Sequence, residues 1–141
     1  MKILIAVDGS AQALATVDAL RKRLGWFRGP VELTLFYSHP PLPYRHAAAW
    51  AGKEAIHSYY EEESDEALAA ARTLLDDHAI PHADEKRIGE PAHEIVAFAV
   101  SGGYDLIVMG THGHTALANL VMGSVATKVL AGSKVPVLFM K

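Results

Sequence analysis

Short apolar runs alternate along the chain with stretches in which apolar residues recur at helical spacing. The first run, Ile3 to Val7, is continuous, which is typical of a strand buried on both faces of a parallel sheet. Ser10 stands where it can cap a helix after the turn at Asp8 and Gly9. The apolar face predicted for that helix consists of Leu14, Val17, Leu20 and Leu24.

The same alternation continues to the end of the chain, with Gly and Pro residues between the segments. Residues 83–88 are polar, as is typical of a strand at the edge of a sheet. Pro91 suits the first turn of a helix. Strands are predicted at Val31 to Tyr37, Ala83 to Ile88, Leu106 to Met109 and Val135 to Met140, and helices at about Lys53 to His78, after Pro91, and at about Ser124 to Leu130.

The longest predicted helix, Lys53 to His78, combines a buried face with a charged one. The run Glu61 to Glu63 is expected to be solvated. Before the helix, Ser38 to Trp50 contains three prolines and no clear period, which predicts a loop of about 12 residues and a candidate lid. The buried face is predicted to consist of Ile56, Tyr60, Ala67, Leu68, Ala71, Leu74 and Leu75.

Strands that alternate with helices in this way indicate an α/β domain, with a parallel sheet and helices on both faces. Right-handed crossovers bring the carboxyl ends of the strands to one side of the sheet. A ligand is expected there, at the point where the strand order reverses.

Composition narrows the class of protein. The 141 residues, 50% of them hydrophobic, predict a single domain covering 1–141. A formal charge of -3 argues against a nucleic-acid partner, and the absence of cysteine excludes disulfides and thiol chemistry. No apolar run is long enough for a membrane span or for the core of a signal peptide. A cytoplasmic protein without a membrane partner is therefore expected.

The most specific pattern follows the fourth predicted strand. Gly110 and Gly113 are separated by two residues, and nine residues then lead to Gly123 and Ser124. Glycines let the backbone approach a ligand closely, and the start of a helix favours an anion. The pattern could therefore hold a phosphate chain. Physical reasoning alone leaves open the alternative that these glycines only form turns.

With these residues in view, the sequence resembles the universal stress protein family, in its nucleotide-binding branch. The family pattern G-x2-G-x9-G-[ST] is met by Gly110, Gly113, Gly123 and Ser124. Three further segments are similar to the sequences usual in the family: the opening Ile3 to Ser10, the Gly89-x-Pro91 turn and the closing Val135 to Leu138.

The resemblance implies an open, doubly wound sheet of five parallel strands in the order 3-2-1-4-5 with about four helices, of the adenine-nucleotide α-hydrolase-like type. It also implies ATP or another adenine nucleotide as ligand, expected with Mg²⁺, and a homodimer. In that strand order, Val135 to Met140 is an apolar edge strand, which a second copy would cover by a two-fold contact. Pro136 lacks an N–H and limits which side of the strand can pair. The alternative is an edge covered by the chain's own helices.

Asp8 matches the family position that contacts adenosine, where a carboxylate can accept hydrogen bonds from ribose or adenine. The alternative is a carboxylate that only caps the turn before the first helix. Ala6, Val7, Tyr37 and Met109 would frame the base, or else form plain core. The residues expected at the nucleotide are Ala6, Val7, Asp8, Tyr37, Met109, Gly110, Thr111, His112, Gly113, His114, Gly123, Ser124, Val125 and Ala126.

One departure from the family concerns His114, where members often carry Arg. The sequence from Gly110 to Val125 then contains no Lys or Arg, so backbone N–H groups, hydroxyl groups including that of Thr115, and Mg²⁺ would meet the phosphate charge. Protonated His112 and His114 could help, and triphosphate affinity is expected to rise below about pH 6.5. The alternative is that both are simply exposed loop residues.

The function expected is that of an ATP-binding stress-response protein whose conformation and interactions change with the bound nucleotide. A hydrolase or phosphotransferase would need a base and a cation at the γ-phosphate, and the motif supplies neither, so no enzyme and no catalytic residues are predicted. A slow ATP hydrolase and an interaction module without nucleotide are the alternatives. His112 and His114 lack a third ligand, so no protein metal site is predicted. The sequence identifies no protein partner.

Overall fold

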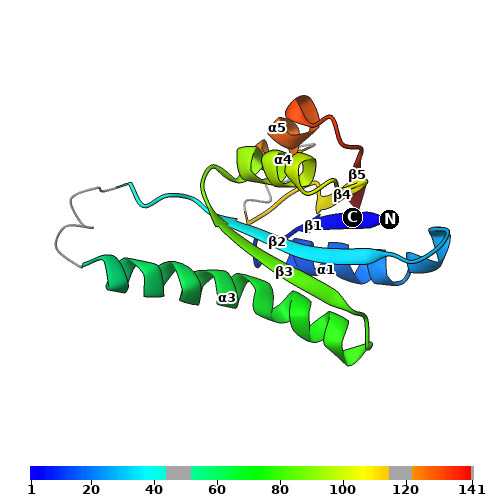
Figure 1. The fold of residues 1–141 in the computed structure, drawn as a ribbon, viewed down its shortest axis with the longest axis horizontal. Coiled ribbons are helices and arrows are strands. Elements are labelled where there is room, and N and C mark those ends of the chain that lie inside the picture. The colour runs from blue at the N-terminus through cyan, green and yellow to red at the C-terminus, as the bar shows by residue number, and fades with distance from the viewer. Residues whose placement is uncertain (44–51, 115–121, 141) are drawn as a thin grey trace.

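Five parallel strands alternate with helices along the chain in the computed structural model, which describes residues 1–43, 52–114 and 122–140 (Figure 1). The elements are β1 (Lys2–Ala6), α1 (Ala11–Arg21), the 3₁₀ helix η1 (Leu24–Trp26), β2 (Glu32–His39), α3 (Lys53–Asp77), β3 (His82–Ile88), α4 (Pro91–Ser101), β4 (Leu106–Gly110), α5 (Ser124–Gly132) and β5 (Val137–Met140).

The strands form one sheet in the order β3-β2-β1-β4-β5, which confirms the predicted fold and strand order. Strand β1 lies between β2 and β4, with Ile3 opposite both Leu33 and Leu106. The switch in strand order therefore falls between β1 and β4. Helices α1 and α3 cover one face of the sheet, and α4 and α5 cover the other (Figure 1).

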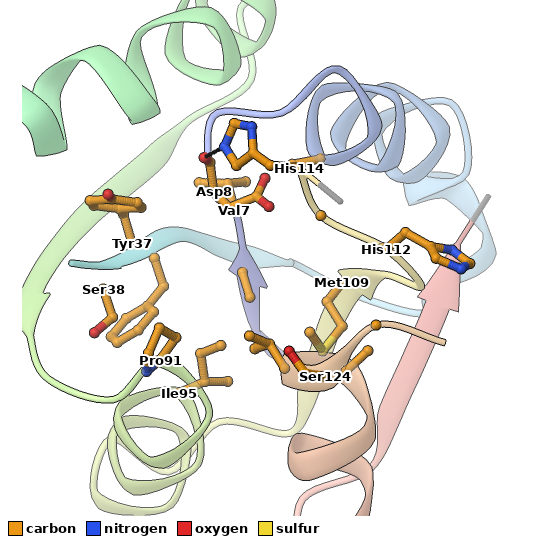
Figure 2. A pocket seen from close by; sticks show the side chains of 18 of the residues that line it. Val7, Asp8, Tyr37, Ser38, Pro91, Ile95, Met109, His112, His114 and Ser124 are labelled. Atoms are coloured by element: carbon orange, nitrogen blue, oxygen red, sulfur yellow. Dashed lines mark hydrogen bonds between the residues drawn. The ribbon is translucent and has the colours of Figure 1, made fainter. Parts of the chain in front are cut away.

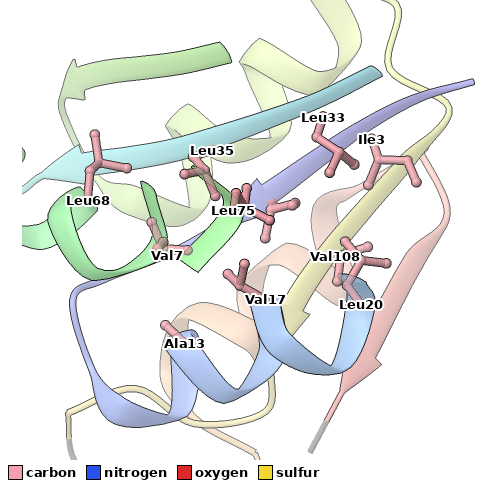
Figure 3. Close-up of a cluster of buried hydrophobic side chains, with 12 residues drawn as sticks. Ile3, Val7, Ala13, Val17, Leu20, Leu33, Leu35, Leu68, Leu75 and Val108 are labelled. Carbon is pink, nitrogen blue, oxygen red and sulfur yellow. The ribbon is translucent and has the colours of Figure 1, made fainter. Parts of the chain in front are cut away.

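The two faces of the sheet have separate hydrophobic cores, and β1 contributes to both. Ile3 and Ile5 pack with α1 and α3 (Figure 3), whereas Leu4 and Ala6 pack with α4 and α5. Successive side chains of a strand point to opposite faces. A strand that is covered on both sides therefore needs the continuous apolar run seen at the N-terminus.

Helix α3 confirms its predicted face in part, because three of the seven predicted residues are buried and the other four are half-buried. Leu68, Ala71 and Leu75 are buried, whereas Ile56 and Tyr60 are only half-buried. Buried side chains of α3 also include that of Ser64, which the apolar pattern missed; its hydroxyl donates to the carbonyl of Tyr60 at 2.6 Å. The glutamates at 61 and 62 are exposed and the one at 63 is half-buried.

Some boundaries differ from the prediction. Leu24 lies in η1 and not on α1, which ends at Arg21. The last strand begins at Val137, because Pro136 cannot continue the ladder as a donor. The first two residues of the predicted loop, 38 and 39, extend β2, and residues 44–50 of that loop lie outside the described residues.

Among the helices of the described ranges, none is both long and apolar enough to cross a membrane. The cytoplasmic location expected from the sequence stays a prediction.

Candidate functional site

A pocket of about 290 Å³ lies at the carboxyl ends of β1, β2 and β4 (Figure 2). Its walls come from the turn after β1, the end of β2, the start of α4, the loop after β4 and the start of α5. Each of the fourteen residues expected at a nucleotide lines this pocket. Thr115, the further hydroxyl expected at the phosphates, lies outside the described residues.

Six more residues line the pocket that sequence reasoning did not select. They share no motif, because strand pairing and helix packing bring them together. Neighbouring parallel strands end on the same side of a sheet. Because β2 lies beside β1, this rule could have identified the residues at the end of β2. The six residues are Ala13, Phe36, Ser38, Pro40, Pro91 and Ile95.

The turn after β1 fixes the Asp8 carboxylate. Asp8 Oδ1 accepts the N–H of Ser10 at 3.0 Å, and Ser10 Oγ caps α1 by accepting the N–H of Ala13 at 3.1 Å. Gly9 has φ +78, and a Cβ there would meet the α3 backbone at Ala67 at 3.1 Å. Asp8 therefore performs the turn-capping role considered for it, and only one of its oxygens is used for this.

The other oxygen, Asp8 Oδ2, faces Gly113. A Cβ built on Gly113 would overlap this oxygen, so the loop after β4 can lie against the carboxylate only if residue 113 is glycine. Gly110 has a packing role as well, because a Cβ there would lie 3.1 Å from Thr16 Oγ1. The packing of the protein therefore favours glycine at both positions, whether or not a ligand is bound.

Gly123 differs from the other two glycines of the motif. A Cβ there would make only ordinary contacts, at 3.5 Å, with the loop at Thr111 and His112. Its φ is -72, which any residue can adopt. The N–H of Gly123 donates to the carbonyl of Thr111 at 2.7 Å, and this bond holds the loop after β4 beside the start of α5.

The two histidines of the loop point in different directions (Figure 2). His114 is exposed, and its Nε2 donates to the carbonyl of Asp8 at 2.6 Å. His112 Nδ1 lies 2.9 Å from Thr111 Oγ1, and its ring is directed away from Asp8 (Figure 2). Within the described ranges, no group of three His, Cys, Asp or Glu residues could hold a metal ion. The effect of pH on triphosphate affinity stays a prediction.

The start of α5 presents hydrogen-bond donors to the pocket. Gly123 is the N-cap and supplies no side chain, and the first turn contains no acidic residue. The first N–H groups of a helix have no partner within it and favour an anion. Ser124, Val125 and Ala126 of this turn line the pocket, and Ser124 lies opposite Asp8 (Figure 2).

At the far end of the pocket, the main chain of Ser38 offers a donor beside an acceptor. Phe36 O accepts the N–H of Val7, so Phe36 faces β1, and His39 O accepts the N–H of Gly89 on the β3 side. The direction of the backbone groups alternates along a strand, so the N–H and C=O of Ser38 point to the same side of β2 as those of Phe36. At Ser38, however, β1 no longer lies alongside, because it has ended at Ala6. The N–H and C=O of Ser38 are therefore directed into the pocket.

Tyr37 closes the same end (Figure 2). Burial raises the pKa of its phenol, and the negative charges of Glu63 and Asp8 and the phenol of Tyr59 raise it further. The hydroxyl thus stays protonated at neutral pH and keeps a hydrogen to donate.

Comparisons with known proteins agree with this geometry. The profile of the universal stress protein family matches residues 1–141. Universal stress protein MJ0531 of Methanocaldococcus jannaschii is 34% identical over 140 residues, which cover 99% of this chain and 81% of the relative.

Two solved structures share the fold. Universal stress protein UspA from Lactobacillus plantarum has a TM-score of 0.83 at 22% identity, over 100% of this chain and 97% of its own. The universal stress protein from Archaeoglobus fulgidus, solved in complex with dAMP, has a TM-score of 0.69 at 24% identity, over 100% of this chain and 98% of its own. The family profile that matches the whole length, together with the relative of 34% identity, shows that this chain belongs to the universal stress protein family.

Proposed function

We propose that this chain is one universal stress protein domain that binds an adenine nucleotide, ATP or a shorter one, in the pocket at the ends of β1 and β4. The observation that carries the proposal is the convergence of the sequence motif on one cavity together with the Ser38 main chain. The dAMP in the Archaeoglobus fulgidus protein of the same fold supports an adenine nucleotide.

The pocket supplies partners for each part of such a ligand. The N–H and C=O of Ser38 match the ring nitrogen and amino group of adenine, between Phe36 and Ile95. Asp8 Oδ2 can accept hydrogen bonds from ribose hydroxyls. The first turn of α5 and the Ser124 hydroxyl can donate to a phosphate. For ATP, Mg²⁺ would be held chiefly by the phosphates, since Asp8 is the one carboxylate among the described lining residues.

We infer that the chain binds nucleotide without efficient turnover. Phosphoryl transfer needs a positioned base and cations around the transferred group. The described lining residues include no Lys or Arg, and Asp8 is already fixed by Ser10 and Gly113. Nucleotide occupancy would instead change the surface that a partner meets.

A homodimer through β5 is part of this proposal. Pro136 O accepts the N–H of Ile107, so the side of Pro136 that lacks a donor faces β4 and not the free edge. Backbone groups alternate in direction along a strand, so the N–H and C=O groups of Val137 and Phe139 point to the opposite side from those of Pro136, toward the free edge of β5. The side that Pro136 limits is therefore the one that faces β4, and the outer edge of β5 keeps its donors.

Two variants at Ser38 test the nucleotide site. Ser38→Pro removes the N–H that is directed into the pocket, while the bonds to β3 involve its neighbours. Ser38→Ala keeps that N–H, and both variants lose the hydroxyl that donates to Gly89 O at 3.2 Å. We expect calorimetric titration with AMP to show at least about a tenfold loss of affinity in Ser38→Pro and near-native affinity in Ser38→Ala. Equal affinities in the two variants would contradict the proposed base site.

A further inference from the structure

The charge of the pocket limits which adenine nucleotide it can hold well. Among the described lining residues, Asp8 is the one carboxylate, His112 and His114 carry imidazole rings, and none is Lys or Arg. Burial raises the pKa of the Tyr37 phenol, and the carboxylate of Glu63 is near enough to raise it further. An anionic ligand thus enters a site whose fixed side-chain charge has its own sign.

The nearest cation of α5 is already engaged. Lys128 follows Ser124 by one helical turn, and its Nζ lies 3.0 Å from Glu90 Oε1. The other oxygen, Glu90 Oε2, caps α4 by accepting the N–H of His93 at 2.8 Å. Both contacts lower the pKa of Glu90, the His93 bond foremost. A phosphate that recruited Lys128 would have to separate it from a carboxylate that is held in place.

The donors among the described lining residues suit one phosphate. The first turn of α5 supplies backbone N–H groups with a partial positive charge of about half a unit, and Ser124 and Thr111 add hydroxyl groups. A negative charge that leaves water without a partner carries a large penalty. The cavity of about 290 Å³ also lies at the low end of the roughly 300–1,000 Å³ range of small-molecule pockets.

We infer that this pocket selects adenine nucleotides by charge and takes a nucleoside monophosphate in preference to a triphosphate. The inference rests on the proposed function, because it concerns the phosphate end of the same site. The β- and γ-phosphates would extend from the first turn of α5 into a pocket whose described lining residues include no Lys or Arg. Arg45 is in the segment 44–51, outside the described residues, and the test below includes it.

The test compares adenosine, AMP and ATP by titration calorimetry on the protein freed of nucleotide, in EDTA and again with Mg²⁺. We expect AMP to bind more tightly than adenosine, because the first turn of α5 holds one phosphate. We expect AMP to bind at least about tenfold more tightly than ATP in EDTA, and to remain the tighter ligand with Mg²⁺.

Variants that change charge around the phosphate end sharpen the comparison. Asp8→Asn keeps an oxygen for the Ser10 N–H but removes the negative charge, and Glu90→Gln keeps the α4 cap but releases Lys128. Each should raise the ratio of ATP affinity to AMP affinity by about threefold or more. Glu32→Gln, an equal change of charge at the start of β2, should leave the ratio unchanged.

The outcomes separate this inference from the proposed function. ATP that binds as tightly as AMP, or AMP that binds no better than adenosine, would overturn the inference and leave the nucleotide site in place. An ATP preference that disappears in Arg45→Gln would overturn it as well, by locating the missing cation. If adenosine, AMP and ATP all fail to bind, the proposed function itself fails.

Discussion

The Asp8 carboxylate lies directly against Gly113, so close that a methyl group at position 113 would overlap Asp8 Oδ2. These two residues lie in the turn after β1 and in the loop after β4, the two segments on either side of the switch in strand order. The contact couples the carboxylate expected at the ribose to the loop expected at the phosphate.

Gly113→Ala should therefore disturb the site more than the fold. The added methyl forces Asp8 or the loop away from its position, and we expect nucleotide affinity to fall by about tenfold or more. Gly132→Ala is the matched control, because a Cβ at Gly132, the last residue of α5, meets nothing within 4 Å. Calorimetric titration with AMP measures both variants, and an unchanged affinity in Gly113→Ala would show that the contact is unimportant for binding.

A substitution on β5 should separate the proposed dimer into monomers. Val137→Pro removes an N–H from the outer edge, whereas the β4 ladder depends on the neighbouring residues Pro136 and Leu138. Light scattering coupled to gel filtration should show a dimer for the wild type and for Val137→Ala, and a monomer for Val137→Pro. A monomeric wild type, or a Val137→Pro variant that stays dimeric, would rule out this edge as the interface.

The ion pairs between α3 and β3 should make the protein sensitive to acid. Lys86, and after it Arg72, lower the pKa of Asp65 below its ordinary value of 3.8. A carboxylate whose pKa is lowered by folding stabilises the folded state above its ordinary pKa, and this contribution is lost as the pH falls through the lower value.

The free energy of unfolding of Asp65→Asn should therefore depend less steeply on pH between about pH 5 and pH 2 than that of the wild type. Urea titrations at several pH values measure this slope. Asp77→Asn is the control, a similar removal of charge at the end of the same helix. If both variants keep the wild-type slope, the Asp65 pairs contribute nothing to acid stability.

Leu68 should be among the most sensitive positions of the core. Its side chain is 0% exposed, between α3 and the sheet, whereas Leu130 on α5 is 53% exposed. Truncation of a buried leucine leaves a cavity, so Leu68→Ala should lower the free energy of unfolding by about 2–5 kcal/mol. Leu130→Ala should change it by about 0.5 kcal/mol or less. Urea denaturation of the two variants compares these values, and similar losses would contradict the assigned packing.

The architecture could be predicted from the sequence because the pattern of apolar and polar residues in each segment indicates which of its faces are buried. Ile3 to Val7 is apolar on both faces, and 83–88 is polar as an edge strand should be. The glycine motif and Asp8 could be placed together because both follow strands that end on the same side. The strand order, by contrast, came from the resemblance to the family.

Other features depend on pairings that no local pattern encodes. Ser38 looks like an ordinary loop residue, and its role as a candidate base contact depends on β1 ending two residues before Asp8 while β2 continues to His39. The side on which Pro136 lacks a donor depends on the register with Ile107. The hydrogen bond from His114 to the carbonyl of Asp8 depends on the fold of the loop.

The measurement that tests the central claim most directly is calorimetric titration of the protein, purified and freed of nucleotide, with AMP. The pocket formed by Asp8, Ser38 and the first turn of α5 predicts one AMP bound per chain with micromolar affinity, and the loss of that binding in Ser38→Pro but not in Ser38→Ala. No detectable binding of AMP or ATP to the wild type would contradict the account and would mean that the glycine motif serves only to pack the loop after β4 against Asp8 and Thr16.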